Sequence, residues 1–285
     1  MKPARPLSLG FSPCPNDTFI FCDLVARIER DSDQFFAPPH LEDVETLNQW
    51  ARAHRLDVTK LSFHAVAHVL DEYCILSAGA ALGRGCGPLL VTTEKRHTVS
   101  LEGGRVAIPG RFTTAALLFQ MFCPEAVDLV EMRFERILDA VATGAVDAGV
   151  IIHESRFTYQ QSGLVCVQDL GQWWEQWSGL PIPLGCIGVR RSIGLELIGE
   201  IENRIRASLQ WARTHPGQCS DYIKRYAQEI DDQVVAQHIA LYVNDFSLDL
   251  GEVGRQAVVA FFERGRRCGA LPSVQHELFC CRPKT

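Results

Sequence analysis

The sequence predicts an α/β protein. Short apolar runs with the length of buried strands alternate with longer segments in which apolar residues recur at helical spacing. Strands that alternate with helices pair into parallel sheets whose faces the helices cover. The chain has 285 residues, of which 47% are hydrophobic and 22% charged. It is therefore long enough for about two globular domains of ordinary composition.

The first part of the chain contains strand-like runs that end in polar residues. Residues 7–11 (LSLGF) stop at Ser12 and a pair of prolines, after which Asn16 or Asp17 can cap a helix. Residues 56–63 (LDVTKLSF) also pass into a polar end. The other elements expected here are a helix at 42–53, a helix with a strand-like finish at 64–76 and a strand at 87–93.

The middle of the chain repeats the strand and helix rhythm, and the last third is mainly helical. A strand is expected at 105–110, and a helix begins at Thr113 or Thr114. Residues 130–152 read as strand, helix and strand. After a strand at 186–191, helical patterns cover 198–215, 222–230, 234–243 and 254–269.

Two similar strands suggest that the chain forms two lobes. GPLLVTT (87–93) and the strand at 186–191 each follow a Gly-Cys pair, and they bracket a middle block with its own rhythm. We expect one lobe from residues 1–93 plus 185–285 and a second from residues 95–183. A chain that leaves one lobe and returns to it creates a cleft, where ligands often bind. One continuous sheet is the alternative.

Composition and charge exclude several function classes. The formal net charge is −6 and no Lys/Arg block is present, so neither nucleic acid nor a membrane surface is an expected partner. No signal-like segment and no apolar run of roughly 18 residues is visible, and a cytoplasmic protein is expected. The 11 cysteines form no CxxC pair, so most are interpreted as small buried hydrophobic residues.

The segment IIHESRF (151–157) is the strongest candidate for chemistry. His153 ends an apolar run that begins at Ala145 and has the composition of a buried strand. Ligands bind at strand ends in open α/β sheets, and a histidine there can move a proton near neutral pH. A structural role in hydrogen bonding is the alternative. Cys14, in the SPCPND turn, is a weaker candidate because the sequence shows no base beside it.

Several motifs, taken together, resemble one enzyme family. They occur in this order: SPCPNDTFIF (12–21), LEDVETLN (41–48), TKLSFHA (59–65), ALGRGCGPLLV (81–91), IPGRFTTA (108–115), AGVIIHESRFTY (148–159), DLGQWW (169–174), GLPIPLG (179–185) and YVNDFSLDLGEVG (242–254). Across almost the whole chain, the sequence is similar to the 1,4-dihydroxy-6-naphthoate synthase family, the menaquinone-pathway lyases of the futalosine route. The cysteine-rich C-terminal segment is least like the family, and we assign it no role.

The resemblance implies a two-lobe fold of the type II periplasmic-binding-protein class, with an inter-lobe cleft. It implies conversion of cyclic dehypoxanthinylfutalosine to 1,4-dihydroxy-6-naphthoate and dihydroxyacetone. The implied partner is thus a small aromatic carboxylate, and no metal or organic cofactor is expected. The family's catalytic histidine falls on His153. Its substrate-binding residues fall on Lys60, Leu61, Ser62, Thr114 and Ala115.

The residues themselves suit this chemistry. The helix that begins near Thr113 and Thr114 can bind a carboxylate, because a helix N-terminus carries partial positive charge. One of these threonines can also serve as the N-cap. Asn16 and Asp17 follow another strand and are expected to line the same cleft. Glu154 would point to the opposite face if the strand continued, toward the core or a nearby arginine.

Other features have simpler explanations. His64 and His68 have a metal-compatible spacing, but no third ligand accompanies them, so a surface or core pair is favoured. The glycines around Arg84 precede a strand, which is the wrong context for dinucleotide binding, although Arg84 could meet an anionic substrate in the cleft. The tryptophans at 173, 174 and 177 are expected to pack rather than to cover the cleft.

Two other function classes stay open at this point. A chorismate dehydratase of the same pathway shares the fold class, and a non-catalytic protein that binds small carboxylates would share the cleft. The motifs around Asn16 and His153 favour the lyase over both.

Overall fold

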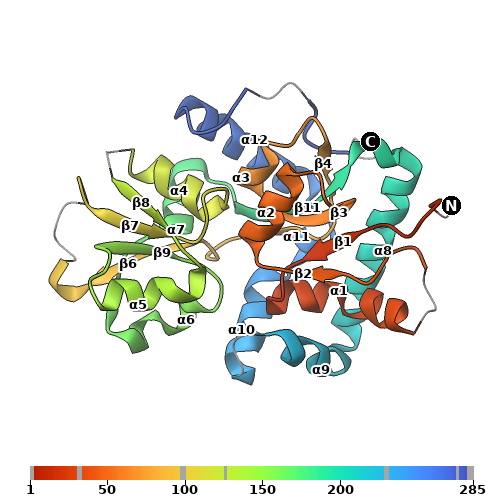
Figure 1. Ribbon diagram of the computed structural model, residues 1–285, viewed down its shortest axis with the longest axis horizontal. Helices are drawn as coiled ribbons and strands as arrows, with labels where there is room; N and C mark the ends of the chain where they lie inside the picture. Colours follow the sequence, from red (N-terminus) through yellow and green to blue (C-terminus); the bar gives the residue numbers. More distant parts are fainter. Residues whose placement is uncertain are drawn as a thin grey trace.

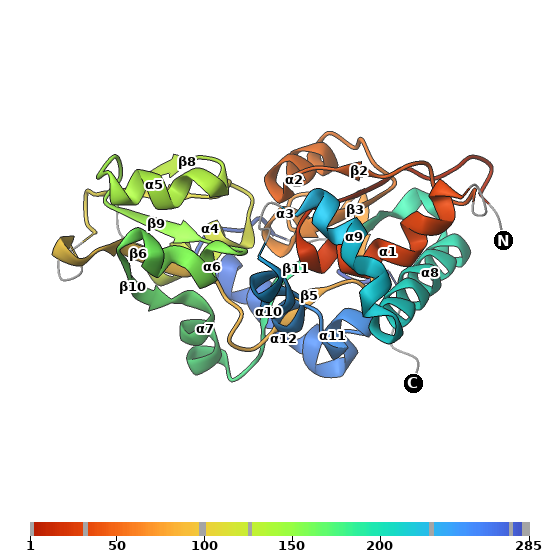
Figure 2. The same ribbon diagram turned by 90° about the horizontal axis from the view of Figure 1, so that it is seen from below.

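The computed structural model describes residues 3–30, 34–96, 101–124, 127–227, 231–273 and 276–280. Two β-sheets form two lobes that lie side by side along the long axis (Figures 1 and 2). The strand order is β2-β1-β3-β11-β4 in the first sheet, where β5 also pairs with β11, and β10-β6-β9-β7-β8 in the second. The predicted α/β fold class with two lobes is confirmed.

The first lobe contains a sheet that combines strands from the first part of the chain with one later strand. Its strands are β1 (Leu9–Phe11), β2 (His40–Leu41), β3 (Val58–Ser62), β4 (Tyr73–Ile75), β5 (Ala81–Gly83) and β11 (Ile182–Arg190). β1 pairs in parallel with β2 and β3, whereas β11 is antiparallel to β3, β4 and β5. The prediction of parallel sheets is therefore wrong for β11, which enters this sheet from the other lobe.

Helices from distant parts of the chain cover this sheet. They are α1 (Pro15–Glu29), α2 (Val44–Arg52), α3 (Phe63–Val66), α8 (Leu195–Thr214), α9 (Pro216–Tyr226), α10 (Asp232–Tyr242), α11 (Asp245–Leu248) and α12 (Gly251–Arg267). Ser208 on α8 fixes α1, because its hydroxyl donates to the carbonyl of Ile20 at 2.8 Å and accepts from Leu24 N at 3.1 Å. Among the described residues, no helix combines the length and apolar character that a membrane crossing needs.

The start of α1 differs from the prediction. Asn16 and Asp17 do not cap this helix, because Pro15 already occupies its first position and Cys14 stands at the N-cap. Proline suits a first helical position, since its φ angle is preset and it has no N–H to leave unpaired. Asn16 and Asp17 consequently lie in the first turn.

The second lobe is built from one continuous stretch of chain. Its strands are β6 (Leu89–Thr93), β7 (Arg105–Ile108), β8 (Asp128–Glu131), β9 (Ala148–Ile151) and β10 (Leu164–Asp169), and its helices are α4 (Thr114–Phe122), α5 (Ile137–Ala142), α6 (Ser155–Thr158) and α7 (Leu170–Ser178). The prediction placed 87–93 in the first lobe, but β6 pairs with β9 and β10. The chain therefore crosses between the lobes before β6, not after it. β6 is antiparallel to both of these strands, so the prediction of parallel sheets is wrong for β6 as well.

Arg156 ties the outgoing crossing to the second lobe. Its guanidinium donates to the carbonyl of Gly85 at 2.9 Å and to that of Gly87, and to a carboxylate oxygen of Asp169 at 2.6 Å. Gly87 packs directly on Gly171, where an added Cβ would lie 2.3 Å from the opposite Cα. One side chain thus holds the outgoing crossing, while two glycines allow that crossing to touch the start of α7.

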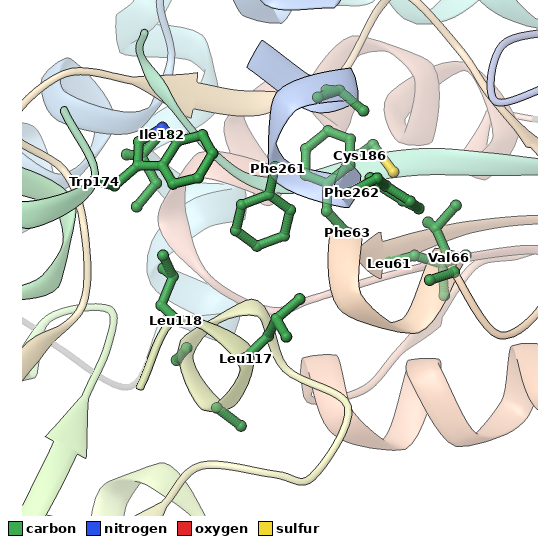
Figure 3. Close-up of a cluster of buried hydrophobic side chains, with 14 of the residues drawn as sticks. Leu61, Phe63, Val66, Leu117, Leu118, Trp174, Ile182, Cys186, Phe261 and Phe262 are labelled. Atoms are coloured by element: carbon green, nitrogen blue, oxygen red, sulfur yellow. The ribbon is translucent and has the colours of Figure 1, made fainter. Parts of the chain in front are cut away.

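One apolar core continues from lobe to lobe. Leu117 and Leu118 of α4 face the aromatic rings of Trp174 and Phe261, as Figure 3 shows. Trp174 is fully buried and its indole N–H donates to the carbonyl of Pro181 at 3.1 Å, so packing is its role. The lobes therefore share a buried interface as well as two crossings.

A disulfide joins the C-terminal segment to the first sheet. Cys74 of β4 is bonded to Cys280, and the backbone on both sides of it pairs as well: Ile75 N donates to Leu278 O at 2.9 Å, and Cys280 N to Ile75 O at 3.1 Å. This corrects the interpretation of these two cysteines as ordinary hydrophobic residues. Their 206-residue separation gave the sequence no spacing signal. The neighbouring Cys281 lies outside the described residues.

Candidate functional site

A cavity lies between the lobes where strand ends and helix starts meet. The first lobe lines it with Ser12, Asn16, Asp17, Val44, Lys60, Ser62, Ala81, Leu184, Gly185, His238 and Tyr242, and the middle segment with Cys86, Pro88, Thr113, Thr114, Ala115, Ile152 and His153. Every predicted site residue except Leu61 and Arg84 is in this group. The ends of β3 and β9 thus converge with the starts of α1 and α4.

The two exceptions have clear structural causes. Leu61 alternates with its neighbours on β3, so its side chain enters the apolar core while Lys60 and Ser62 face the cavity. Arg84 lies on the surface, where its guanidinium donates to Gly179 O at 2.8 Å and approaches Glu175 at 3.6 Å. The structure therefore does not bring the side chains of Leu61 and Arg84 to the cavity.

Lys60 and Asp17 form a buried ion pair in the cavity wall. The ammonium of Lys60 lies 2.6 Å from Asp17 Oδ1, and both side chains are almost fully buried. The Asp17 carboxylate also accepts from Asn16 Nδ2 at 2.8 Å and from the hydroxyl and N–H of Ser12 at 2.7 and 3.2 Å. These donors occupy both oxygens, so Asp17 is poorly placed to act as a base.

The start of α4 presents hydrogen-bond donors to the cavity. Thr113 is its N-cap, because the Thr113 hydroxyl accepts from Ala116 N at 3.2 Å and donates to Gly110 O at 2.7 Å. Thr114 and Ala115 are the first two helical residues, and their N–H groups have no partner within the helix. The Thr114 hydroxyl donates to Leu184 O at 2.5 Å, which links the lobes at the cavity.

His153 stands just beyond the end of β9 in an unusual backbone conformation. Its φ is +55°, in the left-handed region, so the strand does not continue through it. The ring packs against Phe134 at 4.9 Å between centroids, and Nε2 lies 3.8 Å from the Cys14 thiol. Burial is the main cause that lowers the pKa of His153, which leaves a neutral imidazole at pH 7.

The Cys14 thiol is not activated by this contact. Burial, followed by the negative charge of Glu154, raises the pKa of Cys14 well above its ordinary value. A thiol with a raised pKa stays protonated and is a poor nucleophile. Cys14 therefore contributes to the wall around His153 rather than to covalent chemistry.

His238 is a site residue that the sequence reasoning missed. It projects from α10, is fully buried, and its Nε2 lies 2.9 Å from Asn16 Oδ1. Its ring stacks at 6.2 Å on that of His153 and contacts Tyr242 at 4.6 Å. The sequence places His238 at helical spacing from Val235 and Tyr242, and these three residues are the buried ones of α10. This spacing predicts a buried side chain, but it does not show which part of the protein that side chain faces.

Glu154 also differs from its prediction. The chain turns at His153, so Glu154 does not point to the face opposite the site. Its Oε1 lies 3.8 Å from His238 Nδ1. Glu154 lines a second cavity that shares His153 and Val44 with the first. His153 thus lines both cavities, whereas Glu154 lines only the second.

The other histidine pair has a packing role. The rings of His64 and His68 pack at a tilt beside Phe112, and His64 Nδ1 lies 3.1 Å from Thr113 O. In the part of the chain that the structure describes, no group of three or more His, Cys, Asp or Glu side chains could hold a metal ion.

The two sheets, the double crossing and the inter-lobe cavity define a fold like that of periplasmic binding proteins. A ligand-binding component of an ABC-type import system from Staphylococcus aureus superposes with a TM-score of 0.67 at 11% identity, covering 94% of each chain. A protein from Archaeoglobus fulgidus is more similar, with a TM-score of 0.86 at 35% identity, covering 94% of this chain and 99% of that one.

The chain belongs to the family described as menaquinone biosynthesis, whose profile matches residues 7–267. It is 51% identical to a 1,4-dihydroxy-6-naphtoate synthase of Thermus thermophilus, over 94% of this chain and 97% of that protein. It is 42% identical to the enzyme of the same name from Streptomyces coelicolor, over 95% and 96%. The family resemblance seen in the sequence motifs is confirmed.

Proposed function

We propose that this protein is a 1,4-dihydroxy-6-naphthoate synthase, a lyase that converts cyclic dehypoxanthinylfutalosine to 1,4-dihydroxy-6-naphthoate and dihydroxyacetone. Two relatives that align over nearly their full length carry this enzyme's name. The observation that carries the mechanism is His153, a neutral imidazole at a strand end beside an inter-lobe cavity.

The substrate's carboxylate would bind at the start of α4. The N–H groups of Thr114 and Ala115 face the cavity end of a nine-residue helix, where the helix dipole favours an anion. Ser62 lies on the facing wall, and its hydroxyl accepts from Asn48 Nδ2 at 3.1 Å, which leaves its own proton to donate. Nearby Lys60 is already neutralised by Asp17, so the helix start is the favoured anion site.

His153 would act as the general base. Removal of a proton from the sugar-derived ring starts bond cleavage, and aromatisation of the naphthoate ring makes the overall step favourable. General base catalysis of this kind contributes about 10²–10⁴-fold to the rate. The rings of Phe134 and His238 hold the imidazole from two sides.

The test is a His153→Asn variant assayed with the cyclic substrate. Asparagine tolerates the left-handed backbone at this position and retains polarity, but it is not a base. We expect kcat to fall by about 10²-fold or more while separately measured substrate binding is nearly retained. The acidic limb of the kcat/KM profile, which for wild type lies below pH 6.5, should also be lost.

An exposed histidine provides the matched control. His215→Asn alters a side chain that contacts Thr214 on the surface, so this variant should match wild type. Turnover by His153→Asn within a few-fold of wild type would exclude His153 as the base. A wild-type protein that binds the substrate without releasing naphthoate would instead indicate a binding protein.

A further inference from the structure

Two proton acceptors from different lobes face each other beside His153. Glu154 belongs to the second lobe and His238 to α10 of the first, and 3.8 Å separates Glu154 Oε1 from His238 Nδ1. His238 is fully buried and Glu154 is 8% exposed. His238 Nδ1 has no hydrogen-bond partner among the described residues. A buried polar atom of this kind is costly, so its arrangement calls for an explanation.

A chain of hydrogen bonds fixes the tautomer of His238. The Asp17 carboxylate can only accept, so Asn16 must direct its NH₂ group toward it, at 2.8 Å. The carbonyl oxygen of Asn16 then faces His238 Nε2 at 2.9 Å, and Nε2 must carry the hydrogen. In the neutral ring, Nδ1 is consequently a bare lone pair that points at a carboxylate.

One proton between these two atoms would satisfy both of them. Burial, with the charges of Lys60 and any charge on His153, lowers the pKa of His238, so the ring resists becoming a cation by itself. The other titratable groups around it are Tyr242 on the same helix, Asp17 beyond Asn16, and Glu154. An approach of about 1 Å by the Glu154 side chain would form a normal hydrogen bond around a shared proton.

We propose that Glu154 and His238 hold this proton and that Glu154 delivers it to the fragment that leaves, with His238 as the positioning residue. The inference rests on the proposed function. A lyase that divides one molecule into two must return the proton that it removes. His153 takes a proton from carbon, the C–H electron pair moves into the ring as the bond to the fragment breaks, and that fragment takes its proton from Glu154.

The proton count balances over one turnover. His153 ends the cleavage step with one proton more and the Glu154–His238 pair with one fewer. Transfer from His153 back to the pair restores both groups. Glu154 and His153 both line the second cavity, so base and acid border a common space from adjacent positions in the chain.

Two variants separate proton delivery from structural support. In Glu154→Gln, the amide can still donate a hydrogen bond to His238 Nδ1, but it has no acidic proton. In His238→Gln, the amide nitrogen can replace Nε2 as donor to Asn16, and only the Nδ1 acceptor is lost. We expect both to unfold at the wild-type midpoint and to bind substrate, while kcat falls by about 10²-fold.

The pH profile distinguishes this role from simple packing. Wild-type kcat should show a basic limb from loss of the held proton, and both variants should lack that limb while retaining the acidic limb of His153. Glu263→Gln, which changes an exposed carboxylate near Arg267, is the matched control and should behave as wild type. Glu154→Gln with near-wild-type kcat and an unchanged basic limb would overturn the proposal.

The two proposals fail in different ways. If wild type releases no naphthoate from the cyclic substrate, the proposed function is wrong before any variant is compared. If wild type is active and both glutamine variants are also fully active, the function stands and the second proton site does not.

Discussion

Replacing Glu45 with glutamine is expected to stabilise this protein at alkaline pH and to flatten its pH dependence. Glu45 lies in the first turn of α2 and is 8% exposed. Its Oε2 accepts from the N–H of Phe112 at 3.1 Å, and its Oε1 accepts from Gln49 Nε2 at 2.9 Å. The Phe112 contact joins the first lobe to the loop that leads into α4. Burial, which outweighs these hydrogen bonds, raises the pKa of Glu45 to about 7.

The direction of this pH dependence follows from the protons that Glu45 binds in the folded and unfolded protein. The ordinary pKa is 4.5, so between pH 4.5 and about 7 the folded protein holds a proton that the unfolded chain has released. Stability must therefore fall as the pH rises through this window. The loss of stability caused by ionised Glu45 is absent below this pH window and complete above it. At about 1.4 kcal/mol per pH unit, its full size is about 3 kcal/mol.

Glutamine cannot ionise, so it avoids this penalty while retaining an oxygen that can accept from Phe112. Urea unfolding of wild type and Glu45→Gln at pH 4, 6 and 8 measures the difference. The gain from glutamine should grow by about 3 kcal/mol from pH 4 to pH 8, whatever its constant offset from altered hydrogen bonding. Glu263→Gln should show no such growth. Parallel pH profiles for wild type and Glu45→Gln would refute the argument.

Three further substitutions have defined outcomes. Thr114→Val removes a hydroxyl at the proposed anion site, and in steady-state kinetics it should raise KM more than it lowers kcat. The total loss in kcat/KM should correspond to about 1–3 kcal/mol. An unchanged KM would leave Thr114 with only its bond to Leu184. Arg156→Lys cannot reproduce the forked contacts and should lose about 1–3 kcal/mol in urea unfolding, whereas equal stability would contradict its role at the outgoing crossing. Cys280→Ser should lose about 2–4 kcal/mol without reductant, and dithiothreitol should erase the difference from wild type.

Much of the fold was predictable because local patterns determine individual elements. The apolar runs at 7–11, 56–63 and 105–110 contain strands β1, β3 and β7. The four helical patterns of the last third correspond to α8, α9, α10 and α12, although residues 228–230 of the second pattern lie outside the described residues, and the short α11 was not predicted. Strand direction was less accessible. A parallel sheet follows from strictly alternating strands and helices, but β11 enters the first sheet from another lobe and runs antiparallel. The sequence predicted this return to the first lobe, but not the direction of the strand that makes it.

The site was predictable where it depends on strand ends and helix starts. Lys60 and Ser62 lie on one face at the end of β3, and Thr113 to Ala115 lie at the start of α4. The same alternation could have removed Leu61 from the expected set, since a residue between two cavity-facing neighbours points the other way. His238 was inaccessible for a different reason: its partner Asn16 lies 222 positions away in the chain.

The position of Glu154 shows how one backbone angle determines the chemistry of this site. In a continuing strand, His153 and Glu154 would face opposite sides of the sheet. The φ of +55° at His153 ends that alternation and turns both side chains toward the lobe interface. A left-handed conformation is unfavourable for a residue with a Cβ, at about 1–2 kcal/mol, and it persists only where its surroundings hold it. Here the rings of Phe134 and His238 pack against the imidazole, so the contacts that hold the proposed base also maintain the turn that brings a carboxylate beside it.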